Sequence, residues 1–293
     1  MADTPGLSTQ KRLHQTRNPA NGRVTALEEL RRLLPGVDDV HSTVPFGLSA
    51  LDSHLPQGGL AVGALHEVVP ETDRSVSAAF GFMMAVLDRF SSPPPQSLHS
   101  GARKRGPGGG KEKQIILVMP AYGQREHGRL CGHGLNSLGL NPARVTLVET
   151  AHRKETLWAV TEALHSGAPL AVAGMIDRLN LKTSQKLHLA AGDAGLPLLL
   201  IRPARTLEAS AAATRWRVGT AEAARDRFGL LARPRWHLQL ERCRNGRPGQ
   251  WSVEYDHVAH RFSLAAALAD HALSRGAGAW PLERAPISSL GGS

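Results

Sequence analysis

The residues between a predicted strand that ends at Glu67 and a predicted helix at 78–90 stand where nucleotide-binding proteins carry a phosphate-binding loop. Such a loop needs glycines whose backbone N–H groups face the phosphates. It also needs a lysine against the outer phosphates and a Ser or Thr hydroxyl that holds magnesium. The residues that follow the strand are instead Pro70, Glu71, Thr72, Asp73 and Arg74.

This degenerate loop lacks the groups that phosphate chemistry requires. There is no glycine between Pro70 and Ala79 and no lysine, and two acids bring like charge toward any phosphate. Arg74 would be an isolated contact without the backbone cradle. We therefore expect no catalysis and no bound cofactor here. Asp177 ends an apolar run as a magnesium-binding acid would, but an acid between a strand and a helix is commonly a helix cap, and we predict that role.

A second signal is positive charge. The chain carries a formal charge of +10, and residues 202–247 hold eleven arginines against four acids. Such a face attracts polyanions or an acidic protein, although arginine is also abundant throughout the proteins of GC-rich genomes. Several arginines lie beside tryptophans, as in single-strand binders. The candidate contacts to DNA or to a partner, with solvated arginine as the alternative, are Arg215, Trp216, Arg217, Arg233, Arg235, Arg242 and Arg244. On a strand, Trp216 would point away from its two arginine neighbours.

Other chemistry is not indicated. His127, Cys131 and His133 are three possible zinc ligands within seven residues, but a structural zinc site needs four and Cys243 is far away in sequence, so we predict no metal site. No nucleophile elbow and no suitably spaced carboxylate pair occurs. Two cysteines fit free thiols in a reducing compartment. With no signal-peptide pattern and no apolar run of membrane length, we expect a cytoplasmic protein.

The element pattern predicts an α/β fold. Apolar strand segments at 115–118, 144–148, 170–176 and 196–201 alternate with helical patterns at 128–138, 154–164 and 184–194. This order implies a mostly parallel sheet flanked by helices. An antiparallel hairpin follows, because apolar residues alternate with polar ones at 236–240 and 251–255 on either side of a turn.

Composition suggests where the core ends. We expect a basic N-terminal arm at 1–40, with a short amphipathic helix at 24–34, and a main domain at 41–265. A Pro- and Gly-rich stretch at 91–113 predicts a disordered insertion, and 266–293 a C-terminal helix and flexible tail.

The entry to the main domain resembles the core of RecA proteins. The residues that carry this resemblance are a Gly-Leu-x-x-Leu-Asp turn from Gly47 to Asp52 and a Gly-Gly-Leu turn from Gly58 to Leu60, followed by the strand that ends at Glu67. The whole of residues 40–265 is similar to the ImuA family, RecA-like and SulA-related proteins of bacterial inducible-mutagenesis operons. That similarity lies in the order of short motifs at 126–128, 155–158, 214–217, 234–236 and 241–249.

The resemblance implies a function that the residues alone do not. ImuA proteins are understood to act with ImuB, a catalytically inactive Y-family polymerase relative, and with an error-prone C-family DNA polymerase in SOS-induced translesion synthesis. It implies a non-catalytic adaptor that binds these proteins, with RecA and single-stranded DNA as further partners. Two alternatives stay open: a divergent RecA-type DNA-dependent ATPase, and a SulA-like inhibitor of cell division.

Overall fold

Short runs of Val, Leu, Ile and Ala form the central parallel strands of one large sheet. The computed structural model describes residues 42–91, 113–223 and 233–265, and all of these except Ser42 belong to one compact unit. Strands β3 (Leu65–Pro70), β4 (Ile115–Pro120), β6 (Ala171–Met175) and β7 (Leu198–Ile201) are almost entirely buried. Burial on both faces explains why these strands read as continuous apolar runs.

The sheet has nine strands in the order β11-β10-β9-β8-β3-β7-β6-β4-β5. Strand β5 (Val145–Thr150) is an edge strand, and β5, β4, β6, β7, β3 and β8 (Thr214–Thr220) run parallel. From β8 onward the pairing is antiparallel through β9 (Arg235–Cys243), β10 (Gly249–Asp256) and β11 (Arg261–Leu264). The predicted hairpin is thus confirmed, and it extends the parallel sheet instead of standing apart from it.

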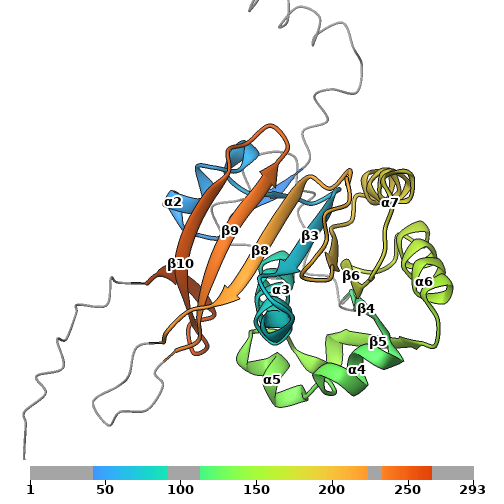
Figure 1. Ribbon diagram of the computed structural model, residues 1–293, viewed down its shortest axis with the longest axis horizontal. Helices are drawn as coiled ribbons and strands as arrows, with labels where there is room; N and C mark the ends of the chain where they lie inside the picture. Colours follow the sequence, from blue (N-terminus) through green and yellow to red (C-terminus); the bar gives the residue numbers. More distant parts are fainter. Residues whose placement is uncertain (1–41, 92–112, 224–232, 266–293) are drawn as a thin grey trace, which may run out of the picture. The chain divides into compact units, whose positions relative to one another are not determined.

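Helices cover both faces of the sheet (Figure 1). On one face, α3 (Val76–Ser91) and α5 (Gly132–Ser137) pack into the larger core, and α4 (Ala121–His127) directly follows β4. On the other face, α6 (Arg153–His165) and α7 (Leu181–Ala194) bury a second apolar cluster. Within the described ranges, no helix has the length and apolar character needed to cross a membrane.

The N-terminal part of the unit explains the Gly-Leu-x-x-Leu-Asp motif. Strands β1 (Thr43–Val44) and β2 (Leu60–Ala61) pair with each other, and α2 (Ser49–Asp52) lies between them in sequence. The Asp52 carboxylate accepts hydrogen bonds from the backbone N–H groups of Phe46, Gly47 and Leu48, at 2.8, 2.9 and 3.0 Å. The acid therefore closes the turn that leads into the core.

The C-terminal hairpin turn packs against this same entry segment. The Arg247 N–H donates to the carbonyl of His54 at 2.9 Å, and a Cβ on Gly246 would come within 2.4 Å of that oxygen. Part of the motif at 241–249 is therefore explained by close packing of backbone on backbone.

The α/β class, with its mostly parallel sheet and flanking helices, is confirmed, and the arrangement is consistent with a RecA-like core. Two local predictions were wrong. The strand predicted to end at Glu67 continues to Pro70. Of the helix predicted at 128–138, only 132–137 is helical, as α5, because residues 128–131 are irregular; α4 lies before the predicted range and was not expected. Gly128, at φ 92°, ends α4 because this backbone conformation cannot continue a helix. The predicted helix at 24–34, the insertion apart from its first and last residues, and 266–293 lie outside the described residues.

Candidate functional site at the carboxyl edge of the parallel strands

The connection from β3 to α3 stands at the position of a phosphate-binding loop, but it is a short closed turn. Pro70 ends the strand, a single 3-10 turn spans Asp73–Ser75, and α3 begins at Val76. The Glu71 N–H donates to the carbonyl of Val218 on β8 at 2.8 Å, and the Ser75 N–H donates to that of Thr72 at 2.9 Å. These two amides are committed to the protein's own carbonyls and are not free to face a phosphate.

Side chains of the connection from β3 to α3 also make it unsuited to bind a phosphate. The Glu71 carboxylate lies against Gly219 of β8, where an added Cβ would come within 1.9 Å of Oε2. The Thr72 and Ser75 hydroxyls hydrogen-bond to each other at 3.0 Å. Asp73 and Arg74 point to solvent. The predicted degenerate loop thus presents an acid over the end of β8, where a phosphate would meet repulsion.

Asp177 lies at the same edge of the sheet but does not cap a helix as predicted. Its carboxylate accepts a hydrogen bond from the Tyr122 hydroxyl, and burial together with this bond raises the Tyr122 pKa above its usual range. Asn180 caps α7 instead, because its side chain accepts from the Thr183 N–H at 2.8 Å. The cap lies three residues further on, since the chain first has to leave the sheet before the helix can begin.

A buried ionic cluster lies beneath the connection between β7 and β8, which we call the crossover segment (residues 202–213). Parallel neighbours of β3 can be joined only by crossing it, and this crossing is made without a helix. The Glu67 carboxylate, which is fully buried, accepts from Arg202 at 3.0 Å, from the Ser210 hydroxyl at 2.9 Å and from Arg215 Nε at 2.8 Å. Both carboxylate oxygens are therefore satisfied, as a buried charge requires.

Arginines also hold the backbone of the crossover segment, which has no regular secondary structure to satisfy its carbonyls. Three contacts are to backbone carbonyls: Arg215 to Glu208 at 3.0 Å, Arg217 to Ala204 at 3.1 Å, and Arg242 to Ser210. Arg202 also binds the Glu208 carboxylate at 2.8 Å. Arg217 also pairs with Glu241. Arginines predicted to contact DNA or a partner thus bind this protein's own chain.

The remaining predicted contact residues do not form one surface. Trp216 is buried at 1% exposure, as its place between two arginines on a strand indicated. Arg233 pairs with Asp256 at 2.8 Å and the buried Arg235 pairs with Glu254, whereas Arg242 and Arg244 are exposed at the other end of β9. Arg235 and Arg242 are seven residues apart on this strand, about 23 Å. Contact with DNA or a partner stays a prediction. The exposed candidates are Arg233, Arg242 and Arg244, of which Arg233 pairs with Asp256 and Arg242 binds the Ser210 carbonyl.

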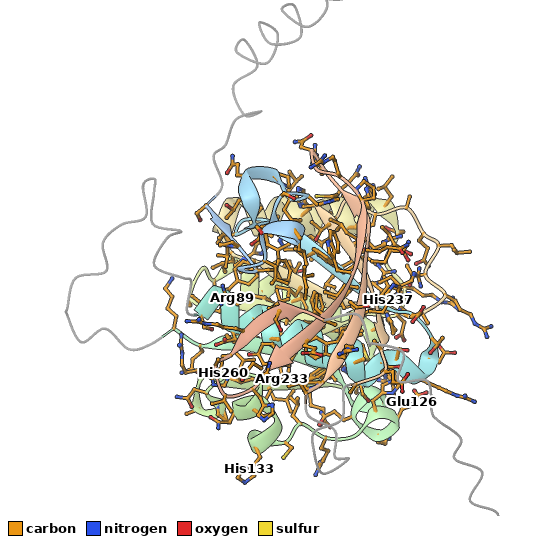
Figure 2. All side chains as sticks on the ribbon, turned by 90° about the vertical axis from the view of Figure 1, so that its left-hand side faces the viewer. Arg89, Glu126, His133, Arg233, His237 and His260 are labelled. Atoms are coloured by element: carbon orange, nitrogen blue, oxygen red, sulfur yellow. The ribbon has the colours of Figure 1, made fainter. Side chains whose placement is uncertain are left out.

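The His127, Cys131 and His133 side chains lie at the surface around the residues that join α4 to α5. Figure 2 shows Glu126 and His133 well apart, with His133 projecting into solvent. In the described part of the chain, no three His, Cys, Asp or Glu side chains come together as a metal ion would need. Backbone N–H groups of Gly134 and His133 lower the pKa of the exposed Cys131 thiol.

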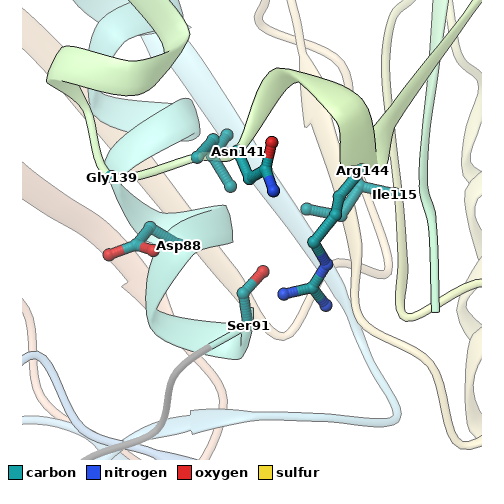
Figure 3. Close-up of a pocket in the computed structure, with 7 residues that line it drawn as sticks. Asp88, Ser91, Ile115, Gly139, Asn141 and Arg144 are labelled. Atoms are coloured by element: carbon teal, nitrogen blue, oxygen red, sulfur yellow. The ribbon is translucent and has the colours of Figure 1, made fainter. Parts of the chain in front are cut away.

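A small polar cavity of about 200 Å³ lies at the far end of α3 (Figure 3). The Arg144 guanidinium turns toward Ser91, and the Asp88 carboxylate turns away from it. Burial raises the Asp88 pKa, the effect being opposed by His260, Arg89 and Arg144. Ser91 is fifteen residues beyond Val76 on α3, about 22 Å, so this cavity is remote from the carboxyl edge where α/β sheets bind ligands.

Sequence reasoning missed the cluster of Glu67 with Arg202. One signal was available, because a charged residue inside an otherwise apolar strand is costly to bury without a partner. The identity of that partner could not be read, since Arg202 lies 135 residues away along the chain.

Comparison with known proteins identifies relatives of this chain. It is 30% identical over 244 residues to Protein ImuA of Caulobacter vibrioides strain NA1000 / CB15N, an alignment that covers 77% of this chain and 90% of the relative. Protein ImuA of Caulobacter vibrioides strain ATCC 19089 / CIP 103742 / CB 15 matches to the same extent. No protein-family profile matches the sequence.

Proposed function

This chain belongs to the ImuA family, and from that membership we propose that it is a non-catalytic accessory protein of SOS-induced, mutagenic translesion DNA synthesis. In this role it binds an ImuB-type Y-family-like protein and an error-prone C-family DNA polymerase, with RecA and single-stranded DNA as further partners. An accessory role in mutagenesis is supported at the level of the family. The named partners and the adaptor mechanism are the proposal.

The single observation that carries the non-catalytic part is the connection from β3 to α3. Its amides at Glu71 and Ser75 are bonded within the fold, and the Glu71 carboxylate covers the end of β8. A nucleotide phosphate placed there would face a carboxylate and lack the lysine and glycine amides that stabilise it. A scaffold of this kind can present surfaces to partners without a cycle of hydrolysis.

Deletion of the coding sequence tests the function directly. Damage-induced mutation frequency should fall toward the uninduced level, and re-expression of the wild-type chain should restore it. Survival is scored in parallel, so that a general defect in repair is distinguished from a loss of mutagenesis. Unchanged mutagenesis in the deletion strain would refute the assignment.

A variant of the degenerate loop tests the non-catalytic part. Arg74→Ala removes the one positive side chain of the connection, and Arg153→Ala on α6 is a matched control at another exposed site. Both variants should restore mutagenesis as well as the wild type, and the purified chain should show no DNA-stimulated ATP hydrolysis. Robust turnover that Arg74→Ala abolishes would establish the divergent ATPase instead.

The SulA-like alternative makes a different prediction. Overexpression of an inhibitor of cell division produces long undivided cells within a few generations, whereas an adaptor of translesion synthesis leaves division unchanged. Cell length after overexpression in undamaged cells therefore separates the two roles.

A further inference from the structure

The strongest feature that the proposed function does not explain is an apolar groove of about 310 Å³ between α3 and α5. Its floor is made by Met84 of α3 and by Met119 and Met175, which lie at the carboxyl ends of β4 and β6, one residue before the last and at the last. Residues 128–131, the irregular link between α4 and α5, form one wall. The groove thus lies beside the degenerate loop, at the carboxyl edge of the sheet.

The lining is suited to apolar side chains. Three of the chain's five methionines gather there, and methionine adapts its shape to partners more readily than branched residues do. Phe80 and Leu130 are only partly buried and pack at the margin of the core. The volume is at the lower end of ligand cavities, about 300–1,000 Å³, and accommodates two or three aliphatic side chains.

The surrounding backbone determines which kind of segment can enter. Strand β4 is paired with β5 and β6, and β6 is paired with β4 and β7, so neither offers a free edge. An extended segment could not gain strand pairing here and would leave its N–H and C=O groups unsatisfied against an apolar surface. A helix satisfies its own backbone groups and presents side chains at spacings of three and four residues.

The rim of the groove carries positive charge. Arg129 lines the opening, is exposed, and forms no hydrogen bond or ion pair with any other described residue. Arg125 is also exposed on the adjoining α4, so the two arginines outnumber the one nearby acid, Glu126, whose carboxylate lies 3.9 Å from His127 Nε2. This balance favours a ligand that has acidic residues beside its apolar face.

We propose that this groove binds an amphipathic helix of a partner protein, with aliphatic side chains inserted among the methionines and acidic residues placed against Arg129. The inference rests on the proposed adaptor role and specifies the surface through which one partner is held. It assigns a function to the segment that contains residues 126–128, a family-resembling motif that the fold alone leaves without a role.

The reactivity of the Cys131 thiol can be used to measure whether the groove is occupied. Its thiol is exposed and lines the groove, whereas Cys243 is partly buried on β9 and serves as an internal control. The full chain is mixed with the full-length Y-family-like protein, complex formation is established by co-elution, and the alkylation rate of each thiol is measured by mass spectrometry. We expect alkylation of Cys131 to slow by about tenfold in the complex while that of Cys243 is unchanged.

Matched variants test the chemistry of recognition. Leu130→Glu places a negative charge in the groove, and Arg129→Glu reverses the sign of the charge at its rim. The controls are Leu189→Glu, at an exposed site on α7, and Arg153→Glu, at an exposed site on α6. Both groove variants should weaken binding by about tenfold or more, and both controls should bind as the wild type does. Arg129→Glu keeps the test valid if Leu130→Glu fails to fold.

The outcomes separate this inference from the proposed function. A complex in which Cys131 reacts at its free rate, or in which the groove variants bind normally, overturns the groove proposal and leaves the adaptor role standing. Failure of the wild type to bind either the Y-family-like protein or the C-family polymerase refutes the adaptor role and the groove with it. Protection of Cys131 by ATP, or by a single-stranded oligonucleotide, instead of by the protein would establish a nucleotide or nucleic-acid site there.

Discussion

The imidazole of His66 should make the stability of this protein depend on pH. It is buried on β3 beneath α3, its Nε2 donates to the Ala61 carbonyl at 2.9 Å, and its Nδ1 lies 2.8 Å from the Thr214 hydroxyl. Trp216 Nε1–H donates to that hydroxyl oxygen at 3.0 Å, so the Thr214 proton is directed at Nδ1. A neutral imidazole completes this series of hydrogen bonds, and burial lowers the His66 pKa to about 4.

The direction of the change in stability follows from the pH at which His66 is protonated in the unfolded and in the folded state. An unfolded His66 is protonated near pH 6.5, whereas the folded one is protonated only near pH 4. Stability is therefore complete above pH 6.5, is lost as pH falls from 6.5 to 4, and changes no further below 4. One pKa unit corresponds to about 1.4 kcal/mol, so the loss is about 2 kcal/mol at pH 5 and about 3 kcal/mol below pH 4.

Urea unfolding at pH 7.5 and pH 5.0, followed by tryptophan fluorescence, measures this loss. His66→Gln should be less stable than the wild type at pH 7.5 because it disturbs a buried hydrogen-bonded chain, yet its further loss at pH 5.0 should be smaller by about 2 kcal/mol. His165→Gln replaces a histidine exposed at the end of α6 and is the matched control. Equal losses in the wild type and His66→Gln would show that this imidazole is not held neutral in the fold.

Three further experiments test contacts within the fold. Glu67→Gln should cost about 3 kcal/mol in urea unfolding because the buried Arg202 loses its buried carboxylate partner and keeps only the half-exposed Glu208, and adding Arg202→Met should recover part of this; no recovery would argue against charge imbalance as the cause. Asp52→Ala should lower unfolding free energy by about 1–3 kcal/mol, since it frees three backbone N–H groups, and a neutral result would contradict the capping role. Gly139→Ala should lower the melting temperature by several degrees, because Gly139 has φ 89° and the new Cβ would come within 2.6 Å of Asp88; an unchanged melting temperature would show that this turn relaxes freely.

Features that depend on neighbours along the chain could be predicted from the sequence. Apolar runs at 115–118 and 170–176 become buried strands, and helical periodicity at 154–164 and 184–194 becomes α6 and α7. Local signals failed where a single residue decides the backbone path. The helix predicted from Gly128 begins only at Gly132, because Gly128 and the residues after it are not helical, and Asn180 takes the capping role predicted for Asp177. Hydrophobic periodicity predicts which face of a helix or strand is buried, but it does not predict the residue at which the helix or strand begins or ends.

The degenerate loop shows what sequence alone could decide about function. A phosphate cradle needs glycine and lysine, and neither occurs in residues 70–77, which is evident before any folding is considered. Packing adds that Glu71 is folded against Gly219 and that the Glu71 and Ser75 amides are bonded internally, so neither of these two amides can bind a phosphate.

The arginines show what only tertiary structure could decide. A guanidinium donates equally well to phosphate, carboxylate or backbone carbonyl, so its residue type does not reveal its partner. Arg215 meets Glu67 from 148 residues away, because the crossover segment must pass over β3 and its carbonyls need donors there. The sequence by itself determined that this protein lacks a phosphate loop and has an excess of arginine. The fold decided that Arg202, Arg215 and Arg217 act inside the molecule, since long-range topology alone brings donor and acceptor together.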